Sequence, residues 1–402
     1  MLPDQTLPRE AADSRDGADA PRASTTRNGL KITTDRVNIR EVAEQAKVSV
    51  ATVSLVLNKS PRISRATSLR VQKTINDLGY QPNRLAQSLS GRYTYSFAIL
   101  LPALRHAFAD AYFGEIISGI CDRAGKMGYK VILEQAKPQY IKDRKHVELF
   151  ERRFVDGVLC AGFNDKHRFL ADFGECKCPM VLVDNKVASM DHVVCDYRLG
   201  AEQALNAILQ LGHRSVALIY AAPESQTARQ VAEVYARKLA DAGIPFDKAL
   251  TEDGCFTDIG GAAAAEKLMK RRPDITAILA NNDKMALGAI RYLQTSGRNV
   301  PKDVSIVGFD DLQHSAFANP SLTTVHLPLY EAGGLACERL LERVHGKIDR
   351  ISENLPTHLV LRESTSLAPI LSAAAESARQ REPAPATPGS QRVGGHDDGN
   401  RG

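Results

Sequence analysis

The stretch Ser49–Asn58, SVATVSLVLN, opens with a serine, a residue that commonly caps helices, and continues as a short helical pattern. Apolar residues at the i, i+3, i+4 spacing form one face of this helix: Val53, Val56 and Leu57. The opposite face is apolar too, and its members are Val50, Ala51 and Leu55. One face suits a protein core, so the other needs a contact of a different kind.

Three short helices are predicted between residues 37 and 78. The first begins at Asn38, with Glu41 three residues later as in a capping box. Its inner face consists of Ile39, Val42, Ala43 and Ala46. Ser64 caps the third helix, which ends before Gly79 and has the apolar stripe Val71, Ile75 and Leu78. Because a very short turn separates the first two helices, the segment is predicted to be a helix-turn-helix module.

The charge of the chain is concentrated in and just after this module. Residues 37–92 contain nine basic and three acidic residues, a charge of +6, whereas the whole chain is +5 and the remainder therefore −1. A compact basic module on a neutral body favours a polyanionic partner. A solvated surface on which charges cluster by chance is the alternative.

The segments around the module differ in character. Residues 1–36 and the tail from about residue 372 lack apolar periodicity, so we expect disordered arms. In YQPNRLAQSLSGRY, residues 80–93, Pro82 suits a first helical turn, and Leu85 and Leu89 are four residues apart. A helix of under three turns is unstable alone in water, so another contact must order it.

From residue 94 onward, apolar strand-like runs alternate with helical patterns. Strands are predicted at 96–102, 130–136, 155–162, 179–185, 216–220, 275–280 and 304–308. Helices are predicted between them, among others at 114–128, 200–212, 262–271 and 285–297. This order indicates parallel sheets covered on both faces. Roughly 280 residues of this pattern are too many for one sheet, so two lobes are predicted.

Several classes of protein are disfavoured. No apolar run approaches the ~20 residues of a membrane-spanning helix, and the N-terminal residues are acidic where a signal peptide would be basic, so we expect a cytoplasmic protein. The seven cysteines are scattered and odd in number, which disfavours a disulfide framework. Cys176 and Cys178 lack a second ligand pair at metal spacing, so neither a metal nor another cofactor is predicted.

An ordered series of motifs resembles the lactose/galactose repressor (LacI/GalR) family of bacterial transcription regulators. The motifs are NIREVAEQAKVSVATVSLVLN, GYQPNRLAQSL, LGHRSVALI, AILANNDKMALGAI, VPKDVSIVGFDD, NPSLTTVHLP and LRES. The similarity extends from about residue 37 to residue 365. Any one motif is weak, whereas the series over more than 300 positions is specific.

The resemblance implies an α/β protein: an all-α helix-turn-helix headpiece and a two-lobed core like a periplasmic binding protein, with parallel doubly wound sheets. The expected segments are a headpiece at 37–82, a hinge helix at 83–93, a core at 94–371 and a tail at 372–402. The N-lobe would comprise about 94–196 and 326–355, and the C-lobe about 197–325 and 356–371. The chain would cross between the lobes three times.

The resemblance also implies what the outer apolar face of the second helix contacts. In such headpieces the second helix enters the major groove, where Val50, Ala51 and Leu55 match the three specificity positions. Apolar side chains can read the thymine methyl group. The alternative is that Leu55 packs against another part of this protein. Better-known members often have a long polar residue at this position, so the operator is expected to differ there.

Other residues are expected to contact DNA without reading the same base edges. The predicted positioning residues are Ser49, Thr52, Ser54 and Asn58, and Asn83 and Arg84 are predicted to bind DNA as well. Leu89 matches the leucine that members insert into the minor groove, where it unstacks a base step. A linker helix docked on the core is the alternative. Gln87 stands where the family often has arginine, which would remove one phosphate contact.

By resemblance, an effector binds between the lobes, where strand ends converge. The predicted effector-binding residues are Phe113, Asp184, Arg229, Phe256, Asn282 and Asp310. For Asp310 a helix-capping role is the alternative. Val231 stands where many members have an arginine, and Arg229 is the candidate substitute for this bidentate clamp.

The leading hypothesis is a homodimeric, sequence-specific repressor that binds a palindromic DNA operator under control of a small, sugar-like metabolite. A solute-binding protein, which shares the core fold, is disfavoured by the basic headpiece and the acidic N-terminus. An enzyme is disfavoured because GxGxxG, GxxxxGK[ST], HExxH and GxSxG are absent, and adjacent Asp310 and Asp311 point apart. The tail has no leucine heptads, which disfavours a tetramer.

Overall fold

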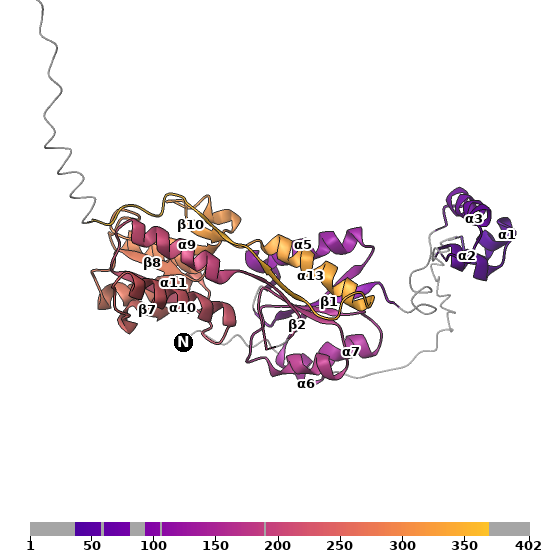
Figure 1. The fold of residues 1–402 in the computed structure, drawn as a ribbon, viewed down its shortest axis with the longest axis horizontal. Coiled ribbons are helices and arrows are strands. Elements are labelled where there is room, and N and C mark those ends of the chain that lie inside the picture. Colours follow the sequence, from indigo (N-terminus) through magenta and orange to yellow (C-terminus); the bar gives the residue numbers. More distant parts are fainter. Residues whose placement is uncertain (1–36, 58–59, 81–92, 105–106, 189, 370–402) are drawn as a thin grey trace, which may run out of the picture. The chain divides into compact units, whose positions relative to one another are not determined.

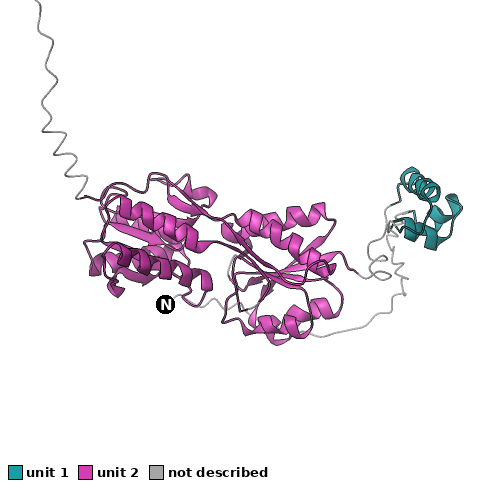
Figure 2. Ribbon diagram, viewed as in Figure 1, with its two compact units in different colours: residues 1–83 teal, residues 84–402 magenta. Residues whose placement is uncertain are grey.

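The structure, a computed structural model, describes residues 37–57, 60–80, 93–104, 107–188 and 190–369. The predicted arms at 1–36 and 372–402, and the predicted hinge helix apart from Tyr93, lie outside these ranges. The chain divides into two compact units, residues 1–83 and 84–402 (Figure 2). Each unit is described by itself.

The described residues of the first unit form three helices: α1 (Ile39–Gln45), α2 (Val50–Leu57) and α3 (Arg65–Asp77). Their starts follow from capping chemistry. The Asn38 side chain accepts hydrogen bonds from the main-chain N–H groups of Arg40 (2.9 Å) and Glu41 (3.2 Å). Ser64 Oγ accepts one from Thr67 N–H at 3.3 Å. These caps satisfy N–H groups that lack a partner within the helix, so the predicted helix starts are confirmed.

The core of this unit is small and apolar. Its buried members are Val42, Ala43, Ala46, Val53, Val56, Val71 and Ile75. They come from all three helices at the predicted spacings. Lys47, in the turn between α1 and α2, has a φ of 53°, a left-handed conformation that turns the chain sharply.

The first sheet of the second unit has the strand order β11-β5-β4-β3-β1-β2, and its neighbouring strands run parallel. Its strands are β1 (Ser96–Pro102), β2 (Lys130–Ala136), β3 (Val158–Ala161), β4 (Met180–Val183), β5 (His192–Cys195) and β11 (Ser352–Leu355). Alternate residues of β1 enter different cores. Phe97, Ile99 and Leu101 pack with α5 (Ala111–Lys126) and α13 (Leu329–Val344), which lie side by side (Figure 1).

The other face of this sheet is covered by shorter helices: α6 (Pro138–Lys142), α7 (Lys145–Glu151), η2 (Arg168–Leu170) and α8 (Ala171–Glu175). Ala98 and Leu100 of β1 join this second core with Val147 and Phe173. The period of two along the strand thus separates two cores. β2 was predicted as a covered strand, but it is an edge strand and Leu133 is 43% exposed.

The second sheet has the order β12-β10-β9-β8-β6-β7. Its strands are β6 (Val216–Tyr220), β7 (Thr251–Asp253), β8 (Ala277–Ala280), β9 (Ser305–Asp310), β10 (Thr323–His326) and β12 (His358–Val360). β10 and β12 are antiparallel and the other pairs parallel. One core lies beside α9 (Tyr197–Gln210) and α10 (Gln226–Asp241), and the other beside α11 (Asp258–Arg271) and α12 (Asp283–Thr295).

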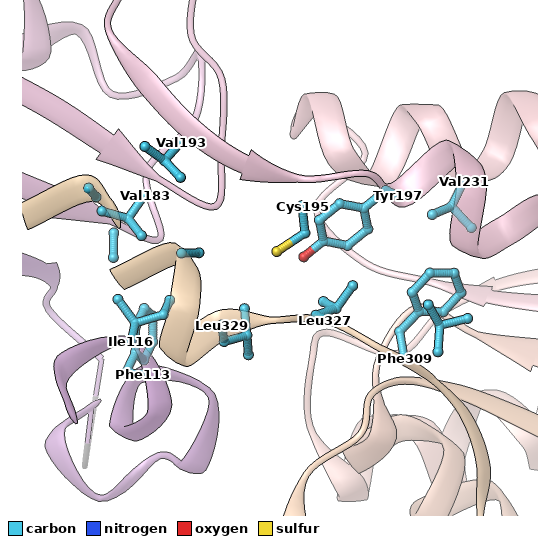
Figure 3. Packing of buried hydrophobic residues seen from close by; sticks show 14 of the residues in the cluster. Phe113, Ile116, Val183, Val193, Cys195, Tyr197, Val231, Phe309, Leu327 and Leu329 are labelled. Carbon is cyan, nitrogen blue, oxygen red and sulfur yellow. The ribbon is translucent and has the colours of Figure 1, made fainter. Parts of the chain in front are cut away.

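The chain passes between the two layered lobes three times within the described residues: from β5 to α9, from β10 to α13, and from β11 to β12. Two of these crossings are apolar. Figure 3 shows Cys195 and Tyr197 on one crossing and Leu327 and Leu329 on the other, all buried in one cluster that extends from Ile116 to Phe309. The predicted α/β class with two parallel-dominated sheets is confirmed.

Three further single turns are η1 (Ala107–Ala109), η3 (Lys248–Leu250) and η4 (Gln313–Ser315).

Among the helices of the described residues, none combines the length and the apolar character that spanning a membrane requires.

Candidate functional site

Helix α2 has two apolar faces with different surroundings. Val53 and Val56 are 0% and 6% exposed and lie in the headpiece core. Val50 and Leu55 are 41% and 37% exposed, and Ala51 is exposed as well. None of these three belongs to the headpiece core, so the described headpiece does not bear out the alternative packing of Leu55. The outer face is available to a partner.

The predicted positioning residues are only partly described. Ser49 Oγ accepts a hydrogen bond from Thr52 N–H at 3.1 Å and lies 2.9 Å from Thr52 Oγ1. Ser49 therefore acts as the predicted helix cap, and Ser54 is half-buried. Four of the predicted DNA contacts lie outside the described residues: Asn58, Asn83, Arg84 and Leu89.

The headpiece carries exposed cations without internal partners. The described ones are Arg40, Lys47, Arg62, Arg65, Arg70 and Lys73. Among the described residues of this unit no side-chain ion pair forms, and along the described chain Asp110 is the first residue to make one. These cations are free to contact a polyanion such as a nucleic acid backbone.

In the second unit a cavity of about 480 Å³ lies where strand ends and helix starts converge. It is lined by Leu104, Ala107, Asp110, Tyr112, Phe113, Gly162, Asn164, Asp184, Asn185, Tyr197, Ala222, Ser225, Thr227, Ala228, Cys255, Phe256, Thr257, Asn281, Asn282, Lys284 and Asp310. These residues come from both lobes. Parallel sheets place their ligand sites at the carboxyl ends of strands, as here.

Asp310 is the last residue of β9 and is 6% exposed. Its φ of 113° is a left-handed conformation that non-glycine residues seldom adopt. Burial, followed by the charges of Asp283 and Asp184, raises the pKa of this carboxyl well above its usual range. The cap position of the following turn is Leu312 and has no side-chain cap bond, so the structure does not place Asp310 as that cap.

Asp184 lines the cavity, but the protein already satisfies its carboxylate. Tyr112 and Tyr197 each donate a hydroxyl hydrogen bond to Oδ2, at 2.7 and 2.6 Å, and Cys195 N–H donates to Oδ1 at 3.1 Å. Its pKa is nevertheless raised by burial. Neither tyrosine was predicted from the sequence, since nothing in their local pattern links positions 72 and 13 residues from Asp184.

The remaining predicted cavity residues divide into two groups. Phe113 is buried, whereas Phe256 is 42% exposed, and both line the cavity. Asn282 also lines it, but its Oδ1 caps α12 by accepting a hydrogen bond from Met285 N–H at 2.9 Å. The asparagine therefore has a structural role as well.

Arg229 does not line the cavity in this structure. Its guanidinium forms an ion pair with Asp165 at 3.0 Å and also donates to the carbonyl oxygen of Glu224. Val231, at the position where many family members have an arginine, is 1% exposed and lies in the core. The bidentate clamp expected from the resemblance is thus not formed by either residue.

Polar contacts join the two lobes beside the cavity. Lys166 and Glu224 form an ion pair at 2.8 Å, next to the pair of Asp165 and Arg229. Asn185 Nδ2 donates to Ser225 Oγ at 3.1 Å, and Lys284 pairs with Asp110. None of these contacts, which link loops and helix starts of different lobes, was predicted from the sequence.

Comparison with known proteins gives both parts of the chain a family. Residues 38–83 match the family of bacterial regulatory proteins, lacI family, and residues 205–365 match a periplasmic binding protein-like domain. Catabolite control protein A of Priestia megaterium is 31% identical over 335 residues, which are 82% of this chain and 99% of that protein. The repressor PurR of Aliivibrio fischeri (strain MJ11) is 31% identical over 317 residues, 77% of this chain and 92% of that protein.

Comparison with solved structures supports the same family. A lac repressor dimer bound to operator and the anti-inducer ONPF is 27% identical with a TM-score of 0.69, and the match covers 82% of this chain and 99% of that one. The complex of the transcriptional regulator CelR with cellobiose is 30% identical with a TM-score of 0.64, covering 82% of this chain and all of that one. The chain therefore belongs to the LacI family of bacterial transcriptional regulators.

Proposed function

We propose that the protein is a transcriptional repressor that binds a pseudo-palindromic DNA operator as a homodimer and is controlled by a small metabolite in the cavity between its lobes. The observation that supports DNA reading most directly is the exposed apolar face of α2, formed by Val50, Ala51 and Leu55. Folding of the headpiece buries only the inner face of α2, so the outer face stays exposed and can contact a partner.

This face suits base reading in the major groove. Branched and methyl side chains can contact the methyl group of thymine, which distinguishes A·T from G·C pairs. The exposed cations of the headpiece would add contacts to phosphates, which position the protein without specifying sequence. We assign the same positioning role to Asn58, Asn83 and Arg84, and the minor-groove wedge to Leu89, on the strength of the family motif alone.

A homodimer is proposed because the proposed operator is a pseudo-palindrome of two half-sites. A single helix-turn-helix reads a short half-site, and two-fold symmetry doubles the site and makes it palindromic. The lac repressor in the matched structure is a dimer bound to operator. A protein that binds the chromosome in this way would be cytoplasmic and associated with the nucleoid.

Effector control is proposed because the cavity draws its walls from both lobes. A ligand that contacts both lobes binds their closed arrangement better than an open one, and only such a difference can shift a two-state equilibrium. We propose lobes at about 94–196 with 326–355 and about 197–325 with 356–371. A sugar-like ligand is supported by the cellobiose complex of the relative CelR.

The test is an in vitro selection of purified full-length protein against random DNA at near-physiological salt. Enrichment of a palindrome with a flexible pyrimidine–purine step at its centre is the expected result. The variant with Val50, Ala51 and Leu55 all replaced by serine is the control, and it should enrich no sequence. A wild-type protein that enriches nothing, with and without a pool of metabolites, would contradict the proposal.

A further inference from the structure

Two histidines lie opposite each other at the edge of the second sheet, away from the cavity lining. β12 is the edge strand and pairs antiparallel with β10, and the register places His326 directly against His358. Opposed residues of an antiparallel pair point to the same face of the sheet, with Cβ atoms about 4.5–5.5 Å apart. The two imidazole rings are accordingly close, with centroids 4.8 Å apart and an angle of 41° between their planes.

The ring of His326 is held in the orientation that a metal ligand needs. Its Nδ1 lies 3.0 Å from Asp311 Oδ2, and since an ionised carboxylate can only accept, Nδ1 donates. Asp311 is itself fixed, because Arg362 donates to its other oxygen at 2.6 Å. A ring N–H that donates to a carboxylate leaves Nε2 with a free electron pair, and most metal-binding histidines are oriented in this way. Among the described residues Nε2 of His326 has no hydrogen-bond partner.

The ring of His358 is free to adjust. The residue is exposed, and within the described part of the chain its side chain makes no hydrogen bond or ion pair. An ion at the usual ~2.0–2.1 Å from each nitrogen requires two nitrogens no more than about 4.2 Å apart. Rotation of the unrestrained His358 ring brings one of its nitrogens within this separation of His326 Nε2. The side chain of His326 is 35% exposed, so an ion can reach both rings from solvent.

We propose that His326 and His358 together bind a divalent transition-metal ion, such as Zn²⁺, Ni²⁺ or Cu²⁺, with water at the remaining coordination positions. Imidazole nitrogens suit these ions, whereas Mg²⁺ and Ca²⁺ prefer oxygen ligands. The described residues contain no group of three or more His, Cys, Asp or Glu side chains placed to hold a metal, so the protein supplies two ligands and solvent the others. The site therefore differs from the closed, four-ligand sites of structural zinc.

The place of the two histidines in the fold gives a bound ion a mechanical effect. β10 leads directly into the crossing that contains Leu327 and Leu329, and β12 follows the crossing from β11. β12 has only three residues, and its pairing with β10 is limited to them. An ion bound to both histidines thus fastens this short edge strand to β10. It also joins two of the three described crossings at the point where they meet the C-lobe.

Isothermal titration calorimetry with Ni²⁺ on the full-length protein, prepared without a histidine tag, tests the proposal. Cys121 and Cys255 are replaced by serine, because exposed thiols also bind such ions. His358→Ala and Asp311→Asn should each weaken nickel binding about tenfold to a hundredfold, the range found when a partner of a metal ligand is lost. His314→Ala removes an exposed histidine of the same lobe outside the pair and should bind as tightly as its parent. Mg²⁺ should give no binding heat at this site.

Electron paramagnetic resonance of Cu²⁺, added at less than one equivalent, identifies the ligands directly. We expect splitting from two imidazole nitrogens in the parent protein and from one after His358→Ala. Since His358 is exposed on an edge strand, this variant is expected to fold, and circular dichroism checks that it does. Nickel affinity that His358→Ala leaves unchanged, or copper bound through fewer than two imidazole nitrogens in the parent protein, overturns the proposal.

Discussion

At the scale of single residues, Leu55 and Val53 are two positions apart on α2 and have opposite environments. Leu55 is 37% exposed and Val53 is fully buried. We expect Leu55→Ala to change the free energy of unfolding by no more than about 0.5 kcal/mol, since a partly exposed side chain contributes little to the core. It should weaken operator binding by roughly 1–3 kcal/mol, the usual cost of one lost base contact.

Val53→Ala is the matched control. It removes buried methyl groups and should lower the free energy of unfolding of the headpiece by roughly 1.5–3 kcal/mol. Urea unfolding and fluorescence anisotropy with labelled operator measure the two effects. If Leu55→Ala destabilised the headpiece as much as Val53→Ala, Leu55 would be a core residue and the reading role would be wrong.

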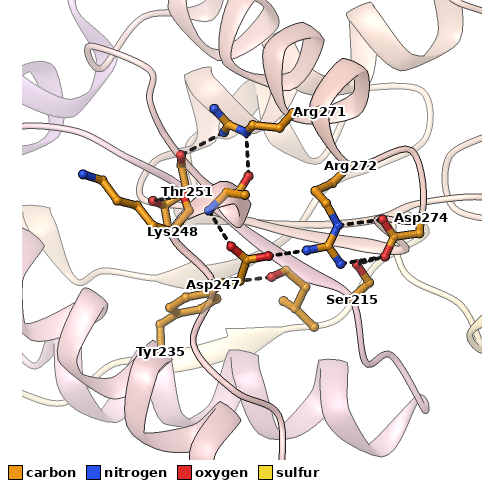
Figure 4. Close-up of polar contacts among 10 residues, drawn as sticks. Ser215, Tyr235, Asp247, Lys248, Thr251, Arg271, Arg272 and Asp274 are labelled. Atoms are coloured by element: carbon orange, nitrogen blue, oxygen red, sulfur yellow. Dashed lines mark hydrogen bonds and ion pairs between the residues drawn. The ribbon is translucent and has the colours of Figure 1, made fainter.

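A second residue-scale prediction concerns Asp274, which lies in a surface network on the second lobe (Figure 4). Arg272 donates two hydrogen bonds to its carboxylate, both at 2.9 Å, and Ser215 Oγ donates a third at 3.0 Å. The bonds from Arg272 are the main cause of a pKa lowered to about 2. The folded protein thus binds this proton less readily than the unfolded chain does.

The sign of the pH effect follows. A carboxyl with a depressed pKa contributes stability above the unfolded pKa of about 4, and that contribution is lost as pH falls toward about 2. We expect wild-type protein to be more stable than Asp274→Asn near neutral pH, because its ionised carboxylate keeps the bonds from Arg272. The difference should be small, since the side chain is 57% exposed and solvent screens the pair. The difference in free energy of unfolding should shrink over this pH window. A difference that stays constant with pH would contradict the assignment.

At the scale of elements, the close packing of α5 on α13 depends on glycine. A Cβ at Gly119 of α5 would overlap the main chain of Tyr330 in α13, which cannot move as a flexible side chain could. We expect Gly119→Ala to destabilise the N-lobe by roughly 1–3 kcal/mol, because overpacking forces the helices apart. Thermal or urea unfolding of the full-length protein measures the change.

The same helix supplies the control for this prediction. Gly125 is exposed, and a Cβ added there would enter open space. Gly125→Ala should raise stability by up to about 1 kcal/mol, since alanine is the better helix former. If Gly119→Ala raised stability as Gly125→Ala is expected to do, helix propensity rather than helix packing would determine the effect.

At the scale of the whole effector-binding unit, the ion pairs beside the cavity favour contact between the lobes. Asp165 with Arg229, and Lys166 with Glu224, are neighbouring pairs of reversed polarity. Exposed pairs of this kind contribute roughly 0.2–1 kcal/mol each, enough to change the ratio of closed to open lobes by up to about fivefold. We expect Arg229→Asp to widen the cleft, and Asp165→Arg combined with Arg229→Asp to restore it.

The distance between spin labels on the two lobes measures this change. Lys142 and Ala240 are suitable sites on α6 and α10, after the exposed Cys121 and Cys255 are replaced by serine. High salt should widen the distribution of label-to-label distances in the wild-type protein, since salt screens exposed charges. It should have less effect on Arg229→Asp. A double variant as open as the single one would show that the pair does not control the lobes.

Much of the local structure could be predicted from the sequence, because capping and periodicity act over a few residues. Asn38, Ser49 and Ser64 cap the helices as expected. The predicted strands at 96–102 and 216–220 have the bounds that the structure gives to β1 and β6. The family, and with it the class of function, followed from motifs whose order along the chain is itself a property of the sequence.

The tertiary structure alone decided which side chains meet. Asp184 lies in a hydrogen-bond network with Tyr112 and Tyr197, and Arg229 is paired with Asp165, 64 residues away, instead of lining the cavity. β11, formed by residues 352–355, aligns beside β5, some 160 residues earlier. The physical reason is that caps and periodicity depend on near neighbours, whereas the partners of a buried charge depend on how distant segments pack, and no local pattern contains that information.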